Sequence, residues 1–208
     1  DKFMWGKADR ISPEAPVPII SIDKISHSPG GAANVALNLS KLSANVYLLA
    51  VVGDDNESNL LEDDLEKQGV KIKFIKDAKK STTTKTRIMA HGQQVVRTDY
   101  ENTNDITSEQ IKHINDMIVA CSSEIDAIII EDYNKGLLVK DCINTILDIA
   151  AKNDIPVYVD PKKENFFVYN KIRLFKPNMF EFESIIDFNK QNKGFEELGE
   201  QLRKKINA

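Results

Sequence analysis

The sequence predicts an α/β fold in which mostly parallel strands are joined by helices. Apolar runs of strand length alternate with stretches of helical spacing, and polar loops follow several of the apolar runs. A chain of 208 residues is long enough for one α/β domain with a sizeable core and hardly long enough for two. We therefore expect one domain over residues 1–208.

The individual elements follow from the periodicity of the apolar residues. Continuous or alternating apolar runs predict strands at 45–52, 70–75, 125–130, 156–159 and 173–176. Helical spacing predicts helices after residue 31 and at 56–68, 107–118, 139–153 and 195–206. Thr107 and Gln110 have the spacing of a capping box, and Gly69 follows the second helix where a C-terminal cap would lie.

Two segments interrupt this alternation, at about 10–24 and 82–99. The prolines of the first segment suit an edge or extended strand, and the second carries two β-rich runs on either side of His91-Gly92, as in a hairpin. Together they are expected to form a small sheet beside the main one. Such a sheet can act as a lid over a cleft or can be an ordinary edge extension, and the sequence leaves both open.

Composition excludes several classes of protein. The formal net charge of -4 offers no basic surface, so we expect no nucleic-acid partner. The apolar runs at 46–52 and 127–130 are far shorter than the about 20 residues of a membrane span. Cys121 and Cys142 lie among apolar residues of helical spacing and are expected to be buried free thiols. We expect a soluble, cytoplasmic protein. The chain begins at Asp1 without a methionine and ends on a charged helical stretch, which is typical of a fragment.

The Gly-rich stretch at 28–36 is the strongest local signal of a binding site. Gly30 and Gly31 precede a helix, so a ligand could approach the backbone closely and meet exposed amides at the helix start. Asn34 can both donate and accept hydrogen bonds from an anionic or polyhydroxyl ligand. A tight loop packed under a neighbouring helix is the alternative.

Polar residues also follow three of the predicted strands. Asp132, Asp160 and Asn178 come after the strands at 125–130, 156–159 and 173–176. Ligands of open parallel sheets bind beyond the carboxyl ends of the strands, so these side chains are expected to face one cleft.

These motifs occur in the order found in ribokinase-like carbohydrate kinases. Besides Asp1 and the Pro-Gly-Gly-Ala-Ala-Asn stretch, the order includes Arg10-Ile-Ser-Pro-Glu-Ala-Pro-Val-Pro18, Gly53-Asp-Asp55, Thr84-Lys-Thr-Arg87, Gln93-Gln94 with Arg97 and Asp99, Asp132-Tyr-Asn-Lys-Gly136, Asp160-Pro-Lys162 and Pro177-Asn-Met-Phe-Glu-Phe-Glu183. The chain most resembles the heptose 7-phosphate kinase domains of bifunctional ADP-heptose synthases, to which the Arg-Ile-Ser-Pro stretch is particular.

The resemblance implies a fold, a reaction and its substrates. It implies a ribokinase-like fold with a small β lid, and transfer of the γ-phosphoryl group of Mg-ATP to the anomeric hydroxyl of D-glycero-β-D-manno-heptose 7-phosphate. The product would be the 1,7-bisphosphate, on the route to ADP-heptose and the lipopolysaccharide core. A homodimer through the lid is a further expectation.

The resemblance also implies roles for individual residues. The residues that it implies in substrate binding are Asp1, Gly30, Gly31, Asn34, Lys85, Arg87, Arg97, Asp132 and Lys135. The residues that it implies in ATP binding are Lys162, Asn178, Met179, Phe180 and Glu181, and it also implies that Glu181 lies near the Mg²⁺ ion. From the residues alone, other interpretations stay open: solvated strand cations, a turn at Asp132, and a helix cap formed by Asn178 and Glu181.

The sequence departs from the family in one respect. The family's Gly-Ala-Gly-Asp motif, which supplies the catalytic base, does not occur, since the glycines after Gly136 are Gly194 and Gly199. We therefore assign no catalytic residue in this fragment and expect it to be inactive alone. The alternatives are a kinase for another sugar and a non-catalytic binding or assembly domain.

Overall fold

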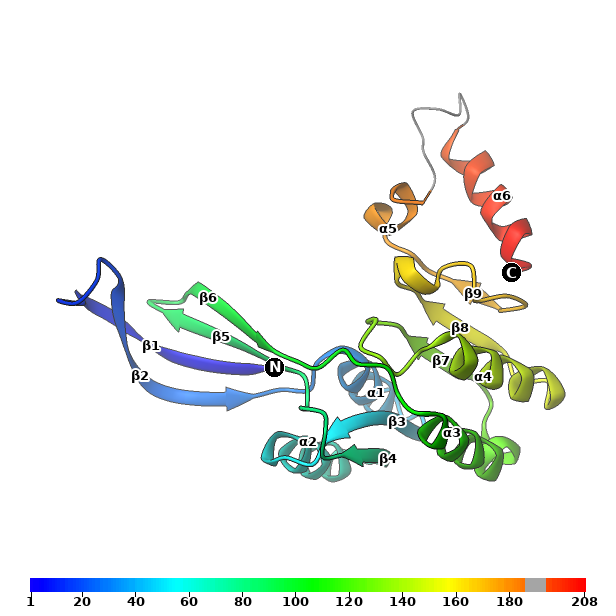
Figure 1. Cartoon of the computed structure of the whole chain (residues 1–208), viewed down its shortest axis with the longest axis horizontal. Coiled ribbons are helices and arrows are strands. Elements are labelled where there is room, and N and C mark those ends of the chain that lie inside the picture. The colour runs from blue at the N-terminus through cyan, green and yellow to red at the C-terminus, as the bar shows by residue number, and fades with distance from the viewer. Residues whose placement is uncertain (186–193) are drawn as a thin grey trace. The chain divides into compact units, whose positions relative to one another are not determined.

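The computed structural model describes residues 1–185 and 194–208. The chain divides into two compact units, 1–102 and 103–208. Each contains parallel strands and helices in alternation along the chain (Figure 1). Because the arrangement of the two units is not described, the expectation of one domain stays a prediction.

Unit 1 begins with a four-stranded sheet in the order β2-β1-β5-β6. Its strands are β1 (Lys2–Ile11), β2 (Pro18–His27), β5 (Thr84–Ala90) and β6 (Gln93–Tyr100). β1 and β2 form one antiparallel hairpin, β5 and β6 form the other, and β1 pairs with β5 in parallel. The predicted small sheet and its hairpin at His91-Gly92 are thus confirmed. The strand that begins at Lys2 was not predicted.

The rest of unit 1 is a parallel pair of strands packed against helices. The elements are α1 (Gly31–Lys41), β3 (Val46–Gly53), α2 (Asn56–Lys67) and β4 (Val70–Asp77). The core joins one face of α1 to both strands and to Leu65 of α2, through Ala33, Ala36, Leu37, Val46, Leu48 and Val70. Gly69 has φ +82° just after the C-cap of α2, as its predicted capping position requires.

Unit 2 is built on a three-stranded parallel sheet in the order β7-β8-β9. Its elements are α3 (Ser108–Cys121), the 3₁₀ helix η1 (Ser122–Glu124), β7 (Ile128–Glu131), α4 (Lys140–Lys152), β8 (Val157–Asp160), the 3₁₀ helix η2 (Lys163–Asn165), β9 (Leu174–Phe175), α5 (Met179–Glu183) and α6 (Phe195–Ile206). Thr107 and Gln110 form the predicted capping box. β7 starts at Ile128, later than predicted, because residues 125–127 form a bend rather than extended strand.

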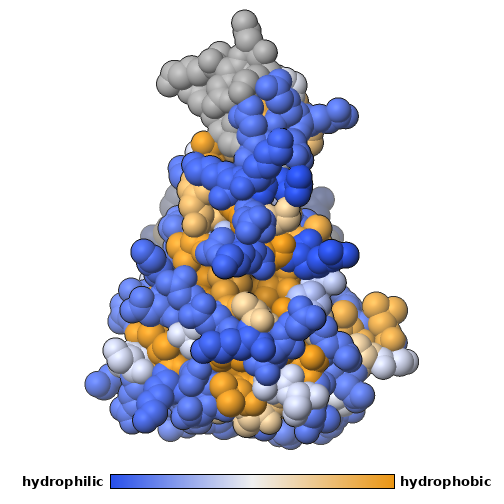
Figure 2. All heavy atoms as spheres, turned by 90° about the vertical axis from the view of Figure 1, so that its right-hand side faces the viewer, coloured by the Kyte–Doolittle hydropathy of each residue, from blue (hydrophilic) through white to orange (hydrophobic). Residues whose placement is uncertain are grey.

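One face of this sheet is covered and the other is not. Ile130, Val157 and Val159 are buried on the covered face, whereas Ile129 and Leu174 point the other way and are exposed. The space-filling view in Figure 2 shows hydrophobic areas among hydrophilic residues on one side of the molecule.

The cysteine prediction is confirmed for one thiol. Both cysteines are free and Cys142 is buried, whereas Cys121 is only partly buried near the end of α3. In the described ranges no helix is long and apolar enough to cross a membrane, and no group of three or more His, Cys, Asp or Glu side chains could hold a metal ion.

Candidate active site

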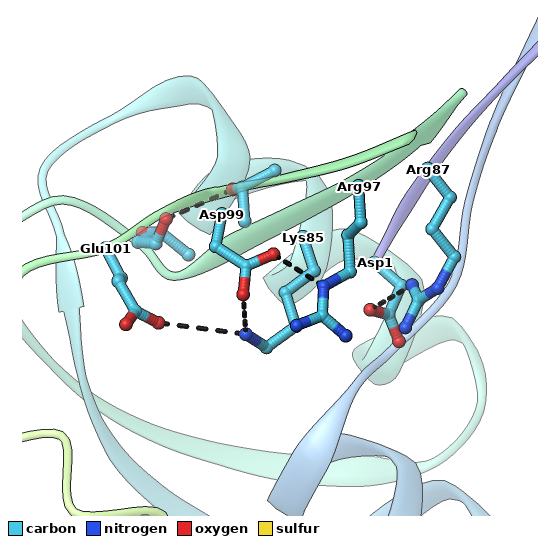
Figure 3. Close-up of polar contacts among 8 residues, drawn as sticks. Asp1, Lys85, Arg87, Arg97, Asp99 and Glu101 are labelled. Atoms are coloured by element: carbon cyan, nitrogen blue, oxygen red, sulfur yellow. Dashed lines mark hydrogen bonds and ion pairs between the residues drawn. The ribbon is translucent and has the colours of Figure 1, made fainter. Parts of the chain in front are cut away.

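The candidate acceptor residues of unit 1 lie on one face of the four-stranded sheet. Lys85 and Arg87 are two residues apart on β5, so their side chains share a face. In the strand register Arg97 lies opposite Arg87, and Asp99 opposite Lys85. Figure 3 shows these side chains gathered with Asp1 and Glu101.

Lys85, Arg87 and Arg97 each have a carboxylate partner. The Arg87 guanidinium donates to Asp1 Oδ1 at 2.7 Å and lies over the Phe3 ring, 5.3 Å from its centroid. Lys85 Nζ is 2.7 Å from Asp99 Oδ2 and 3.8 Å from Glu101 Oε2, and Arg97 Nε donates to Asp99 Oδ1 at 2.9 Å. The hydrogen bond from Lys85 holds the pKa of Asp99 below its usual value. Guanidinium and ammonium groups arranged in this way can bind a phosphate.

The Gly-rich stretch lies beside Asp1. A Cβ added at Gly30 would come within 2.9 Å of Asp1 Oδ2, so only glycine leaves room for that carboxylate without a shift. Gly31 begins α1 with φ +51°, and no side chain in the described part of the chain caps this helix start. Asn34 is exposed one turn further along α1. Asp1, Gly30 and Arg87 are therefore brought together, and their binding of substrate stays a prediction.

Asp132 and Lys135 lie in the loop after β7, in unit 2. Asp132 is 3% exposed, and its carboxylate accepts hydrogen bonds from the Asn134 amide at 2.8 Å, Asn165 Nδ2 at 3.0 Å and Tyr169 Oη at 2.7 Å. Burial and the Asp132 carboxylate raise the pKa of Tyr169 well above its usual value. This geometry favours the alternative in which Asp132 holds the loop. Its contact with substrate, like that of half-buried Lys135, stays a prediction.

Gly136 in the same loop has a left-handed backbone angle. Its φ is +79°, and a Cβ there would lie 1.9 Å from the Asn104 carbonyl oxygen. No side chain fits at that distance, so position 136 requires glycine.

The candidate nucleotide residues of unit 2 lie around the start of α5. Asn178 caps this short helix and forms a capping box with Glu181, so the predicted cap is confirmed. Lys162 donates to Glu181 Oε1, and the Asn178 amide donates to Oε2 at 2.9 Å. Burial raises the pKa of Glu181, but the bonds from Lys162 and Asn178 outweigh it and leave the pKa low. Met179 and Phe180 are exposed beside them, by 54% and 81%.

A second group of charges lies at the carboxyl ends of β7, β8 and β9. Asp160 accepts an ion pair from Lys176 at 2.8 Å, and Glu131 lies opposite Asp160 in the strand register. Burial, with the Asp160 charge added, raises the pKa of Glu131. Asp160 was predicted to be a cleft residue, but Glu131 and Lys176 were not, because their proximity to Asp160 depends on the register of the strands.

Comparison with known proteins decides the family. A family model described as pfkB family carbohydrate kinase matches residues 4–208. The chain belongs to the pfkB family. Among its relatives are proteins named "Bifunctional protein HldE": that of Marinomonas sp. (strain MWYL1) is 37% identical over 99% of this chain, and that of Helicobacter pylori (strain J99) is 40% identical over 89%. The chain spans 43% and 40% of the lengths of these two proteins.

Solved structures place this pfkB-family chain in the ribokinase-like α/β fold, as predicted. A possible 1-phosphofructokinase from Thermotoga maritima has a TM-score of 0.71 at 17% identity, and the match covers 98% of this chain and 66% of that one. A ribokinase from the same organism has a TM-score of 0.64 at 20% identity, with 99% and 66% covered. At such identities the likeness establishes the fold alone.

Proposed function

We propose that the protein containing this chain transfers a phosphoryl group from ATP to the anomeric hydroxyl of D-glycero-β-D-manno-heptose 7-phosphate, in the cytoplasm, for ADP-heptose and lipopolysaccharide core synthesis. The observation that carries the proposal is the cluster of Lys85, Arg87 and Arg97 on one sheet face beside Asp1 and Gly30. A sugar substrate that already bears a phosphate needs a binding site with cations around its phosphate and with hydrogen-bond acceptors around its hydroxyl groups. Relatives named "Bifunctional protein HldE" support the heptose branch of the family.

ATP is proposed to bind at the start of α5. Lys162 supplies a cation, while exposed Met179 and Phe180 offer apolar surface to an aromatic base. The residues do not fit a direct magnesium site, because both carboxylate oxygens of Glu181 already accept hydrogen bonds from Lys162 and Asn178. A metal role for Glu181 therefore requires an intervening water or release from Lys162.

A homodimer through the small sheet is also part of the proposal. The face opposite the charged cluster is apolar and hollowed, and it is lined by Met4, Pro18, Ile20, Ile22, Ile88, Val95 and Val96. Several of these side chains are exposed, and exposed apolar patches commonly mark association surfaces. Sedimentation of the wild type and of Val96→Asp tests this, because the substitution should dissociate a dimer that uses this face.

The alternatives are a kinase for another sugar and a domain that binds without catalysis. An ATP-consumption assay on the intact protein with phosphorylated and unphosphorylated sugars separates them. We expect the heptose 7-phosphate to be used best. A better unphosphorylated acceptor would favour another sugar kinase, and no turnover with any sugar would favour a binding domain. The 208-residue chain alone should not phosphorylate any sugar, because it lacks the Gly-Ala-Gly-Asp motif.

A further inference from the structure

Asp99 lies between two of the cations in the acceptor cluster. One of its carboxylate oxygens is 2.7 Å from Lys85 Nζ, and the other accepts from Arg97 Nε at 2.9 Å. The two contacts come from different strands, since Lys85 is on β5 while Arg97 and Asp99 are on β6. Figure 3 shows both cationic side chains directed at this one carboxylate. Asp99 therefore couples the positions of two flexible side chains.

The strand register explains why an acid is needed here. Arg87 and Arg97 lie directly opposite each other across β5 and β6. Like charges in directly opposed positions of an antiparallel pair destabilise it and push the side chains apart. Asp99, two residues along the same strand as Arg97, draws that guanidinium toward Lys85 instead.

The atom that Arg97 uses matters for its remaining donors. Its bond to Asp99 goes through Nε, so that bond leaves the two terminal nitrogens of the guanidinium for another acceptor. Lys85 has three N–H donors and reaches Asp99 and Glu101 with its Nζ. A carboxylate placed in this way orients both cations without using all their donors.

We propose that Asp99 is a positioning residue for phosphate recognition, which holds Lys85 and Arg97 in the arrangement that receives the phosphate of the acceptor. The proposal rests on the proposed function, in which these cations bind that phosphate. Asp99 itself does not contact the phosphate.

A positioning role and a purely electrostatic role of Asp99 predict opposite effects of Asp99→Asn on the binding of a phosphate. The cluster contains three cations, Lys85, Arg87 and Arg97, and three carboxylates, Asp1, Asp99 and Glu101. If Asp99 acted only through its charge, Asp99→Asn would remove a negative charge and strengthen the binding of an anion. If Asp99 positions the two cations, the same substitution weakens it.

The test is steady-state kinetics of the full-length protein with heptose 7-phosphate. Asp99→Asn should raise the KM for this acceptor about fivefold to tenfold, the scale of a weakened hydrogen bond to a charged group. The kcat, the KM for ATP and the KM for the unphosphorylated heptose should stay unchanged. Asp9→Asn is the matched control, because it removes an exposed carboxylate from β1 of the same sheet. Asp99→Ser carries the same expectation if the Asn variant fails to fold.

A double-mutant cycle shows whether Asp99 acts through its two partners. In a Lys85→Ala, Arg97→Ala background, adding Asp99→Asn should have no further effect on the KM for heptose 7-phosphate. An unchanged or lowered KM for Asp99→Asn in the otherwise wild-type protein would overturn the positioning role. If the Lys85→Ala, Arg97→Ala protein itself keeps the wild-type KM for the phosphorylated acceptor, the proposed phosphate site is wrong.

Discussion

The carboxylate of Asp1 lies 2.7 Å from the guanidinium of Arg87, 86 positions further along the chain. The parallel pairing of β1 with β5 makes this contact possible, because it sets Lys2 opposite Thr86 and Phe3 opposite Arg87. A residue proposed to bind sugar hydroxyls thus adjoins a residue proposed to bind phosphate. Their pairing also fixes the Arg87 side chain over the Phe3 ring.

Arg87→Ala should selectively impair use of a phosphorylated acceptor. Loss of a charged hydrogen bond costs about 1.5–3 kcal/mol, so kcat/KM for heptose 7-phosphate should fall about tenfold or more. The unphosphorylated heptose should be affected far less. Arg10→Ala, which removes an exposed arginine near the end of β1, is the control. Equal losses with both acceptors would make Arg87 a structural residue.

Asp1→Ala and Asn34→Ala should each raise the KM for heptose 7-phosphate and leave the KM for ATP nearly unchanged. Both residues belong to unit 1 and its Gly-rich stretch, whereas the proposed nucleotide residues belong to unit 2. A drop of about tenfold in catalytic efficiency is expected from one lost hydrogen bond to a charged group or hydroxyl cluster. Unchanged acceptor kinetics in both variants would remove them from the site.

Glu181→Gln should lower the thermal stability of the protein. Gln keeps the shape and the capping-box spacing but loses the ion pair with Lys162, and a partly exposed pair of this kind contributes about 1 kcal/mol. The control is Glu181→Gln introduced into a protein that already carries Lys162→Gln. In that background the Glu181 substitution should lower the thermal stability little further. A shifted Mg²⁺ requirement at unchanged melting temperature would instead support the proposed metal role.

Asp55→Ala should destabilise the fold by about 1–2 kcal/mol, because Asp55 caps α2. Its carboxylate accepts from the Ser58 amide at 2.9 Å and from the Thr82 amide and hydroxyl at 2.8 and 2.7 Å. Burial raises the pKa of Asp55, but these bonds from Thr82 and Ser58 outweigh it and lower the pKa. Urea unfolding measures the difference, with exposed Asp54→Ala as the control.

Because the pKa of Asp55 is low, the difference in stability between the wild type and Asp55→Ala should depend on pH. The folded form binds the proton less readily than the unfolded form, so the stabilisation is present above the unfolded pKa of about 4 and is lost as pH falls through the folded value. The gap between wild type and Asp55→Ala should therefore narrow on acidification below pH about 4. A gap that stays constant to low pH would show that the carboxylate charge is not involved.

The two thiols should differ in reactivity. Burial raises the pKa of Cys142 to about 11, and its side chain is fully buried in α4. The thiolate is the reactive form, so a thiol-specific reagent at pH about 8 should modify Cys121 first and Cys142 only on unfolding. Cys121→Ser should remove the fast phase. A fast phase that persists in that variant would contradict the burial of Cys142.

Local signals in the sequence predicted much of the fold. The capping boxes at Thr107 and Asn178 and the hairpin at His91-Gly92 each depend on residues within a few positions of one another. β1 was missed because most of its residues are half-buried without a strict alternation of buried and exposed positions. Its pairing with β5 joins segments far apart in the chain.

The candidate site was predicted less completely, because its contacts also join segments far apart in the chain. The sequence identified Lys85, Arg87 and Arg97 as cations but assigned no role to Asp99, whose contact with Lys85 depends on the cross-strand register. Asp132 was predicted to face a ligand, yet its carboxylate is bonded to Asn165 and Tyr169, which lie more than one element away. Contacts of this kind are set by tertiary packing, which local patterns do not encode.

The position of the transferred phosphate tests the account most directly. The intact protein should be incubated with Mg-ATP and heptose 7-phosphate, and the product examined by phosphorus NMR with coupling to the sugar protons. We predict a second sugar phosphate coupled to the anomeric proton, beside the retained 7-phosphate, and a rate that falls in Arg87→Ala. A product phosphorylated at another hydroxyl, or faster turnover of a sugar without a phosphate, would contradict the assignment of the charged sheet face to a phosphorylated heptose.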